Sequence, residues 1–288
     1  DRRRMTRSRS LMDRRALFAT GAAAALLAAT GVSAAVAPKT GGRLRMALSG
    51  ASRSDSWDRG NGLFMQVARQ GLIFDTLTEI AADGTLRGEL ATSWRGSADG
   101  GVWEFDLRED VQFHDGYPMT AKDVVASLML EGLVEAVTPH LVRITLAVPS
   151  MNLPFTLSGP DHVIGAAHAP LSGVGTGLYR LRRFTPGQQV LAERVSDHYK
   201  GANAGWFDAV ELVSIPAEAV RAQAMAEYMV DVADVKDAEF LAALDDIVLM
   251  PSTRGMTHAV SRNVAMPGKT GQFRPLDNLR AAERWWFA

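Results

Sequence analysis

The amino-acid sequence predicts an α/β fold, in which strands and helices alternate along most of the chain. Segments such as 102–107 place apolar residues at every second position, which is typical of a half-buried strand. Segments such as 217–228 place apolar residues three and four positions apart, which is typical of an amphipathic helix. No internal repeat or heptad pattern competes with this interpretation.

The expected elements follow one another along the chain. Strands are expected at residues 44–48, 102–107, 142–148, 179–184, 190–195, 210–215, 230–235 and 247–250, and helices at 64–70, 120–128, 217–228 and 237–244. A hairpin is expected across Thr185-Pro186-Gly187, because Pro and Gly favour tight turns. Pro216 favours the first turn of a helix and therefore marks a helix start. The connection 149–170 is expected to contain one helical turn.

The segment 94–128 has the most informative order of elements. After the strand at 102–107, Arg108-Glu109-Asp110 turns the chain, and Val111 and Phe113 indicate a second short strand. His114-Asp115-Gly116 then predicts a turn in which Gly116 has a positive φ.

A helix is expected to follow this turn. Thr120 and Asp123 have the spacing of a capping box, in which each side chain binds the other residue's backbone N–H. The buried face of this helix is expected to consist of Val124, Val125 and Leu128.

Residues 1–34 are predicted to be a secretory signal peptide, cleaved near Ala34. Residues 1–15 contain seven Arg and two Asp, and residues 16–32 are apolar and rich in Ala. Val32-Ser33-Ala34 supplies the small-x-small cleavage pattern.

Arg14-Arg15, followed by Leu17 and Phe18, resembles a twin-arginine export motif. The general secretory route is the alternative. A membrane anchor is a further alternative, but the apolar run is at the short end of the roughly 17–25 residues that a membrane span requires.

Composition limits the classes of partner. Without the predicted signal peptide, 24 of the 31 basic and 30 of the 32 acidic side chains remain, so the net charge is near −6. Nucleic acids and anionic membrane surfaces reward clustered Lys and Arg, so neither is expected as a partner. The sequence has no Cys, so it has no disulfide, no Cys-based zinc site and no Cys for lipid attachment. These features predict a diffusible exported monomer.

Taken in order, these motifs resemble the signature region of the extracellular solute-binding proteins of ABC transporters for peptides, dipeptides and nickel (solute-binding family 5). The resemblance extends beyond 94–128. Residues 42–47 look like the first strand of the family, and residues 89–94 look like the usual lead into the signature. Residues 175–181 match the GTGPY element of the family, except that Leu178 replaces Pro. Such an ordered series of motifs is a strong indication of the family but a weak indication of which ligand is bound.

The resemblance implies an α/β fold like that of type II periplasmic binding proteins, with a first lobe built on a central mixed sheet and a smaller inserted α+β domain. The core domain of lobe I would comprise residues 35–75, 173–252 and 268–288. The insert would comprise residues 76–172 and carry the signature.

The family normally continues into a large third domain, which forms the opposing lobe. Only residues 252–288 follow Pro251 here. The chain therefore resembles a family member without most of its second lobe, and 253–267 is the expected junction. Residues 275–288 look like the family tail that packs on the first domain, and an exposed remnant is the alternative.

The expected ligand-binding residues follow from the chemistry of a peptide. Its ammonium requires a carboxylate, and its carboxylate requires an Arg or a helix N-terminus. In the resembled family, the carboxylate comes from the third domain, and no residue here matches it. The expected contacts are therefore lobe-I residues, namely Asp55, Trp57, Gly175, Thr176 and Gly177.

Four of these five residues also have a purely structural interpretation. Trp57 would anchor its loop, Asp55 would cap it, and Gly175 and Gly177 would form a tight turn without contacting a ligand.

Patterns for catalysis, metal binding and cofactor binding are absent from the sequence. None of the six His forms a helical metal-binding pair with an acid, and there is neither a G-x-S-x-G elbow nor a phosphate-binding loop. Asp231, Asp234 and Asp237 are interpreted as solvated carboxylates, with helix capping as the alternative for Asp237. We expect no cofactor, no metal and no enzymatic activity.

The resemblance implies a periplasmic solute-binding component of a peptide-type ABC importer. Such a protein binds an oligopeptide, dipeptide or similar small solute non-covalently and delivers it to a permease in the inner membrane. Two alternatives remain. A relative that binds no solute would act as an interaction protein, whereas a periplasmic hydrolase would require a nucleophile or a metal constellation.

Overall fold

The computed structural model describes residues 41–58, 60, 62–80, 85–200, 205, 207–251 and 257–261. The predicted signal peptide, the predicted core segment 268–288 with its tail at 275–288, and most of the predicted junction at 253–267 lie outside the described residues. No helix in the described ranges is long and apolar enough to cross a membrane.

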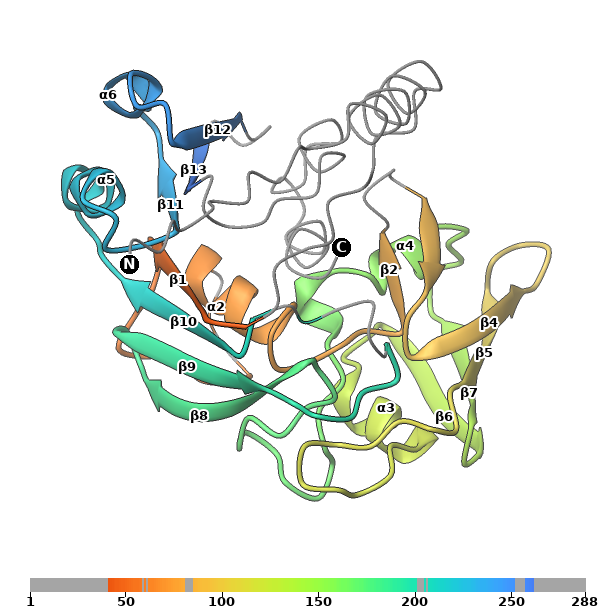
Figure 1. Ribbon diagram of the computed structural model, residues 1–288. Helices are drawn as coiled ribbons and strands as arrows, with labels where there is room; N and C mark the ends of the chain where they lie inside the picture. The colour runs from red at the N-terminus through yellow and green to blue at the C-terminus, as the bar shows by residue number, and fades with distance from the viewer. Residues whose placement is uncertain are drawn as a thin grey trace, which may run out of the picture. The chain divides into compact units, whose positions relative to one another are not determined.

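The central sheet has seven strands in the order β12-β13-β11-β1-β10-β9-β8 (Figure 1). The strands are β1 (Arg43–Leu48), β8 (Tyr179–Thr185), β9 (Gln189–Arg194), β10 (Ala209–Ser214), β11 (Val232–Val235), β12 (Ile247–Pro251) and β13 (Thr257–Ser261). β1 is parallel to β10 and to β11, and the remaining pairs are antiparallel. The predicted mixed sheet is therefore confirmed.

Side chains alternate along β1 and therefore point to both faces of the sheet, and a helix packs against each face. Leu44, Met46 and Leu48 point into a core that they share with Phe64 of α2 (Leu63–Arg69). Ala47 points the opposite way, into a second core that includes Met225 of α5 (Glu218–Ala226). The second half of β1 is thus buried on both faces, as expected for a central strand of an α/β sheet, whereas Arg43 and Arg45 in its first half reach solvent.

The region that follows α2 forms two further sheets. The larger sheet is antiparallel, with the strand order β4-β5-β7-β6, and the smaller pairs β2 with β3. The strands are β2 (Thr78–Ile80), β3 (Leu86–Gly88), β4 (Ala91–Gly96), β5 (Val102–Leu107), β6 (Gly132–Thr138) and β7 (Leu141–Leu146). Inward residues of β5 and β7, such as Phe105 and Ile144, belong to a separate core. The domain boundaries near residues 75 and 172 stay a prediction.

The signature region folds largely as expected. Thr120 and Asp123 form the predicted capping box at the start of α3 (Ala121–Ser127), and Gly116 has a φ of 90°. The expected burial of Val125 is wrong, since this side chain is 37% exposed whereas Val124 is buried. One residue corresponds to about 100° of rotation around a helix, which turns Val125 away from the core. The expected short strand at 111–113 is reduced to an isolated bridge from Gln112 to Pro118.

The connection 149–170 contains the expected helical turn, α4 (Leu153–Thr156), and also the short 3₁₀ turn η1 (Pro160–His162). α5 and α6 are shorter than predicted, and α6 spans only Glu239–Ala242. Pro216 precedes the N-cap of α5, Ala217, so it lies outside the helix that it was expected to begin. β13 is an addition, because it lies inside the segment that was expected to be only a junction.

Candidate functional site

The carboxyl ends of β1, β10 and β11 form the edge of the central sheet that topology favours for ligand binding. β10 lies on one side of β1 and β11 lies on the other, although β10 and β11 are joined by a single crossover through α5. The chain therefore continues to one side of β1 up to β10 and then crosses to the other side to form β11, which makes β1 a topological switch point. In open α/β sheets, ligands bind at the carboxyl ends of the strands at such a switch point.

At this edge, the loop that leaves β1 is attached to β11. The backbone N–H of Ser49 donates to Asp234 Oδ1 at 2.8 Å, and its hydroxyl donates to Asp234 Oδ2 at 2.5 Å. Asp234 is fully buried, so its interpretation as a solvated carboxylate is wrong. β11 lies between β1 and β13, where no side chain reaches solvent, and Ser49 supplies donors that compensate for burial of the carboxylate.

The neighbouring carboxylates have different roles. Asp231 accepts a hydrogen bond from the backbone N–H of Arg45 at 2.8 Å. Asp237 Oδ1 accepts one from the backbone N–H of Glu239 at 3.0 Å, although the N-cap of α6 is Ala238. The acids at 231, 234 and 237 thus have different partners, and the first two bind β1 and its outgoing loop.

Asp55 and Trp57 lie in the loop that leaves β1, and both are buried. Asp55 Oδ2 accepts the backbone N–H of Ser52 at 2.7 Å, which closes a turn. The Trp57 ring lies 4.7 Å from the Phe184 ring and 5.8 Å from the Phe74 ring, measured between centroids. Both side chains thus stabilise the shape of the loop, and their contact with a solute stays a prediction.

Gly175, Thr176 and Gly177 lie where the chain passes very close to other backbone. A Cβ atom at Gly175 would lie 2.0 Å from the Ile73 carbonyl oxygen, and one at Gly177 would lie 2.2 Å from that of Leu72. Only glycine fits at both positions. The hydroxyl of Thr176, between them, donates to Asp75 Oδ2 at 3.0 Å.

The predicted contact residues therefore fall into two groups. β8 is antiparallel to β9, and β9 is antiparallel to β10, so β8 runs in the same direction as β1. The segment 175–177 enters β8 at its amino end, whereas the loop with Asp55 and Trp57 leaves β1 at its carboxyl end. The two groups come from opposite ends of their strands, yet both lie against Phe74. The Phe74 ring lies 5.8 Å from the Trp57 ring, and a Cβ atom at Gly175 would lie 2.7 Å from Phe74 Cδ1.

An open groove of about 800 Å³ lies beside the segment 175–177. One wall belongs to the signature turn, with Asp110 and His114, and the other belongs to β8 and β9, with Arg180 and Arg194. The lining also includes Thr176, Gly177 and His198.

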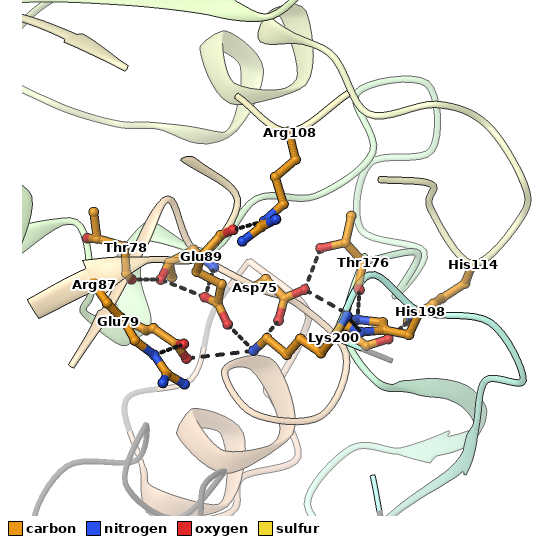
Figure 2. Close-up of polar contacts among 12 residues, drawn as sticks. Asp75, Thr78, Glu79, Arg87, Glu89, Arg108, His114, Thr176, His198 and Lys200 are labelled. Carbon is orange, nitrogen blue, oxygen red and sulfur yellow. Dashed lines mark hydrogen bonds and ion pairs between the residues drawn. The ribbon is translucent and has the colours of Figure 1, made fainter. Parts of the chain in front are cut away.

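A buried set of ionisable residues adjoins this groove, and we call it the Lys200 network (Asp75, Glu79, Glu89, His198 and Lys200). Figure 2 shows the ammonium of Lys200 directed at three carboxylates. Lys200 Nζ lies 2.5 Å from Glu89 Oε1, 3.6 Å from Glu79 Oε2 and 3.9 Å from Asp75 Oδ1. The side chain of Lys200 is 17% exposed and that of Glu89 is fully buried, so the charges compensate one another away from water.

Burial disfavours the charged form of the two histidines of the groove. Desolvation by burial lowers the pKa of His198, although Asp75 opposes this shift, and desolvation also lowers the pKa of His114. His198 Nε2 lies 2.9 Å from the Thr176 carbonyl oxygen, and its Nδ1 accepts the backbone N–H of Lys200 at 3.0 Å. Both nitrogens of His198 are therefore occupied, which leaves neither a free acid nor a free base on this ring.

Sequence reasoning missed the Lys200 network, because its members are spread between residues 75 and 200. The burial of Asp234 could have been predicted from its neighbours, because this acid lies among the apolar residues Val232, Ala233 and Val235 in a predicted strand. Within the described ranges, no group of three His, Cys, Asp or Glu is placed to hold a metal ion.

Two curated relatives from Escherichia coli (strain K12) match this chain. The probable D,D-dipeptide-binding periplasmic protein DdpA is 28% identical over 186 residues, which make up 55% of this chain and 36% of that protein. The nickel-binding periplasmic protein is 40% identical over 57 residues, which make up 20% of this chain and 11% of that protein. The chain therefore spans well under half the length of both relatives.

Solved structures show the same fold. The periplasmic binding protein AgaA from A. tumefaciens R10, in complex with agropinic acid, has a TM-score of 0.65 and 26% identity. The match covers 73% of this chain and 48% of AgaA. The oligopeptide-binding protein AppA from Bacillus subtilis, in complex with a nonapeptide, has a TM-score of 0.63 and 18% identity, with 74% and 48% covered. These matches confirm the expected type II periplasmic-binding-protein fold.

The family model described as bacterial extracellular solute-binding proteins, family 5 (middle), matches residues 85–130 and 131–280. These ranges include the signature region, β8 to β13 and the carboxyl ends of β10 and β11. Because the match extends over more than half of the chain, this protein belongs to the bacterial extracellular solute-binding proteins of family 5.

Proposed function

We propose that this protein is the solute-binding component of a peptide-type ABC importer. Family membership is the observation that carries this proposal. A D,D-dipeptide-binding protein among the relatives and the nonapeptide complex of AppA favour a peptide. Nickel and agropinic acid, which the names of other matches mention, are the competing solutes.

The lobe-I wall of the solute site would lie at the carboxyl edge of β1, β10 and β11. The loop that leaves β1 contributes Asp55 and Trp57, whose buried side chains hold its backbone in a fixed shape. A fixed backbone favours peptide recognition, because an extended peptide is bound mainly through main-chain hydrogen bonds. Gly175, Thr176 and Gly177 would contribute near the hinge, where Thr176 and Gly177 line the groove.

The proposed site of action is the periplasm. The predicted signal peptide, with its twin-arginine-like motif, would direct export and be cleaved near Ala34. The monomeric protein would then deliver its solute to a permease in the inner membrane by hinge closure between lobes.

Calorimetry on the protein purified after export would test this function. The proposal expects sub-micromolar binding of components from a mixed pool of di- to hexapeptides. Binding of a nickel–histidine complex instead would support the solute-binding role but contradict the proposed peptide specificity. Binding of neither probe would overturn the proposal and favour an interaction protein that holds no solute.

A further inference from the structure

Arg221 occupies an unusual position for a charged side chain. It lies in α5, it is 3% exposed, and it faces the central sheet beneath the carboxyl ends of β10 and β11. Its Nη1 donates to the carbonyl oxygens of Ile215 and Pro216 at 2.6 and 2.9 Å. These two residues form the loop that leaves β10. One end of the guanidinium is therefore attached to the exit of one parallel strand.

The other end of the guanidinium is attached to β11. Arg221 Nε donates to the backbone carbonyl of Asp234 at 2.7 Å and lies 3.4 Å from the Asp234 carboxylate. The carboxylate in turn accepts both hydrogen bonds from Ser49, the first residue after β1. A continuous series from Arg221 through Asp234 to Ser49 thus connects the exits of all three parallel strands.

Burial of two charges requires this degree of hydrogen bonding. A guanidinium and a carboxylate lose much of their hydration in the interior, and the loss is compensated only when well-placed partners replace water. Each partner here lies at or next to the carboxyl end of a parallel strand. A change in the relative position of these strand ends would therefore leave a buried charge without a hydrogen bond. The pair therefore penalises alternative arrangements of this edge.

We propose that Arg221 and Asp234 are positioning residues, which hold the loop after β1 in a fixed register with the loops after β10 and β11. They act through Ser49, and they do not contact the solute. The effect on solute binding rests on the proposed function, whereas the effect on the loop does not.

Asp231, the residue immediately before β11, provides a control for the same substitution. Like Asp234, it accepts a backbone N–H at 2.8 Å, and it lies three positions earlier. Its donor is Arg45, in the first half of β1, far from the strand exit. Asp231→Asn therefore makes the same chemical change without touching the proposed series.

The first measurement is hydrogen exchange on the full chain, read for residues 49–57. Asp234→Asn and Arg221→Met should each accelerate amide exchange in this loop about tenfold or more, because a charge-assisted hydrogen bond is lost. Asp231→Asn should leave the loop unchanged, and the β8–β9 hairpin should be unchanged in every variant. Equal acceleration in Asp231→Asn, or a uniform increase across the sheet, would overturn the proposal.

Arg221→Lys separates geometry from charge. A lysine ammonium keeps the charge, but it lacks the planar fork that reaches carbonyls on two sides. The loop in this variant should exchange as fast as in Arg221→Met. Wild-type exchange in Arg221→Lys would show that charge alone suffices, which contradicts the proposal. Ser49→Ala, which removes only the hydroxyl, should give a smaller acceleration.

The second measurement is calorimetry with the same peptide pool, at a temperature where circular dichroism shows every variant to be folded. Asp234→Asn should weaken binding about tenfold relative to Asp231→Asn. Equal affinities, despite faster loop exchange, would overturn the positioning role in binding. If the wild-type chain binds no peptide, the proposed function fails, and the exchange experiment still decides whether the series positions the loop.

Discussion

Two groups of charged residues in this protein have similar ion-pair distances, but one group is buried and the other is exposed to solvent. The Lys200 network is buried and joins residues that are far apart in the sequence. The second group, which we call the Arg95 ladder, consists of Arg95, Glu104 and Arg143 on the adjacent strands β4, β5 and β7. Arg95 Nη2 lies 2.6 Å from Glu104 Oε2, and Arg143 Nη2 lies 2.7 Å from Glu104 Oε1.

Burial separates the two groups. The side chains of Arg95 and Arg143 are 60% and 43% exposed, so water and salt screen the ladder. The carboxylate of Glu89 has no exposure, and Lys200 has little. A short ion-pair distance is therefore a poor guide to energy unless the exposure of both partners is known.

The strongest test of this difference is Lys200→Met. The substitution leaves the carboxylates of Asp75, Glu79 and Glu89 buried without their shared ammonium. We expect the free energy of unfolding to fall by about 3–5 kcal/mol, as measured by urea denaturation. Arg182→Met, which breaks an exposed ion pair with Glu193, is the control and should cost less than about 1 kcal/mol. Equal losses in the two variants would contradict the role that we assign to burial.

Glu89→Gln should have a smaller effect on the same network. The amide oxygen still accepts the backbone N–H of Thr76, and Asp75 and Glu79 still face Lys200. We expect a loss of about 1–3 kcal/mol in the urea experiment. A loss larger than that of Lys200→Met would show that the network depends on Glu89 more than on the ammonium.

The two buried histidines predict how stability depends on pH. Burial lowers the folded-state pKa of His114 and His198 below the value of 6.5 expected in the unfolded chain. The unfolded state therefore binds more protons as the pH falls below about 6.5, and stability decreases in that direction. Each ring contributes a slope of at most about 1.4 kcal/mol per pH unit, and stability should be flat above this window.

Urea midpoints between pH 8 and pH 5 would check this expectation, since the unfolded-state pKa of His is about 6.5. His198→Gln should reduce the slope. A slope of the opposite sign would mean that Asp75 stabilises the imidazolium more than burial disfavours it.

The Arg95 ladder should show the smallest effect. Glu104→Gln removes the central charge of three cross-strand neighbours, but water screens both arginines. We expect no measurable change in the urea midpoint, either at low salt or at about 1 M NaCl, where the Debye length is about 3 Å. A clear loss at low salt that disappears at high salt would show that the ladder stabilises this sheet.

Local sequence patterns predicted the strands whose apolar residues alternate and the helices whose apolar residues lie on one face. β1, β5 and the β8–β9 hairpin were expected from alternation, and α3 was expected from its capping box. β6 was not expected, because nearly all of its residues are exposed and it carries little pattern. β2 and β3 have three residues each, too few for a periodic signal.

The site was less predictable than the fold, for a physical reason. Asp55 and Trp57 were placed correctly in the loop after β1, but the roles of Arg221 and Asp234 depend on contacts between residues that are far apart in the sequence. An isolated acid in a sequence looks solvated until a neighbouring strand covers it. The Lys200 network has the same origin, since Glu89 and Lys200 are 111 positions apart.

The position of β13 has a consequence for synthesis of the chain. β13 comes after β11 and β12 in the sequence, yet it lies between them in the sheet. In the described part of the sheet, β12 pairs with β13 alone, so it has no partner until residue 261 has left the ribosome. Until then, β11 presents an open edge, which is a site for unwanted pairing with another chain. Among the described strands, the last to be made therefore completes the interior of the sheet, and a nascent chain that stalls before Thr257 exposes the edge of β11 to aggregation.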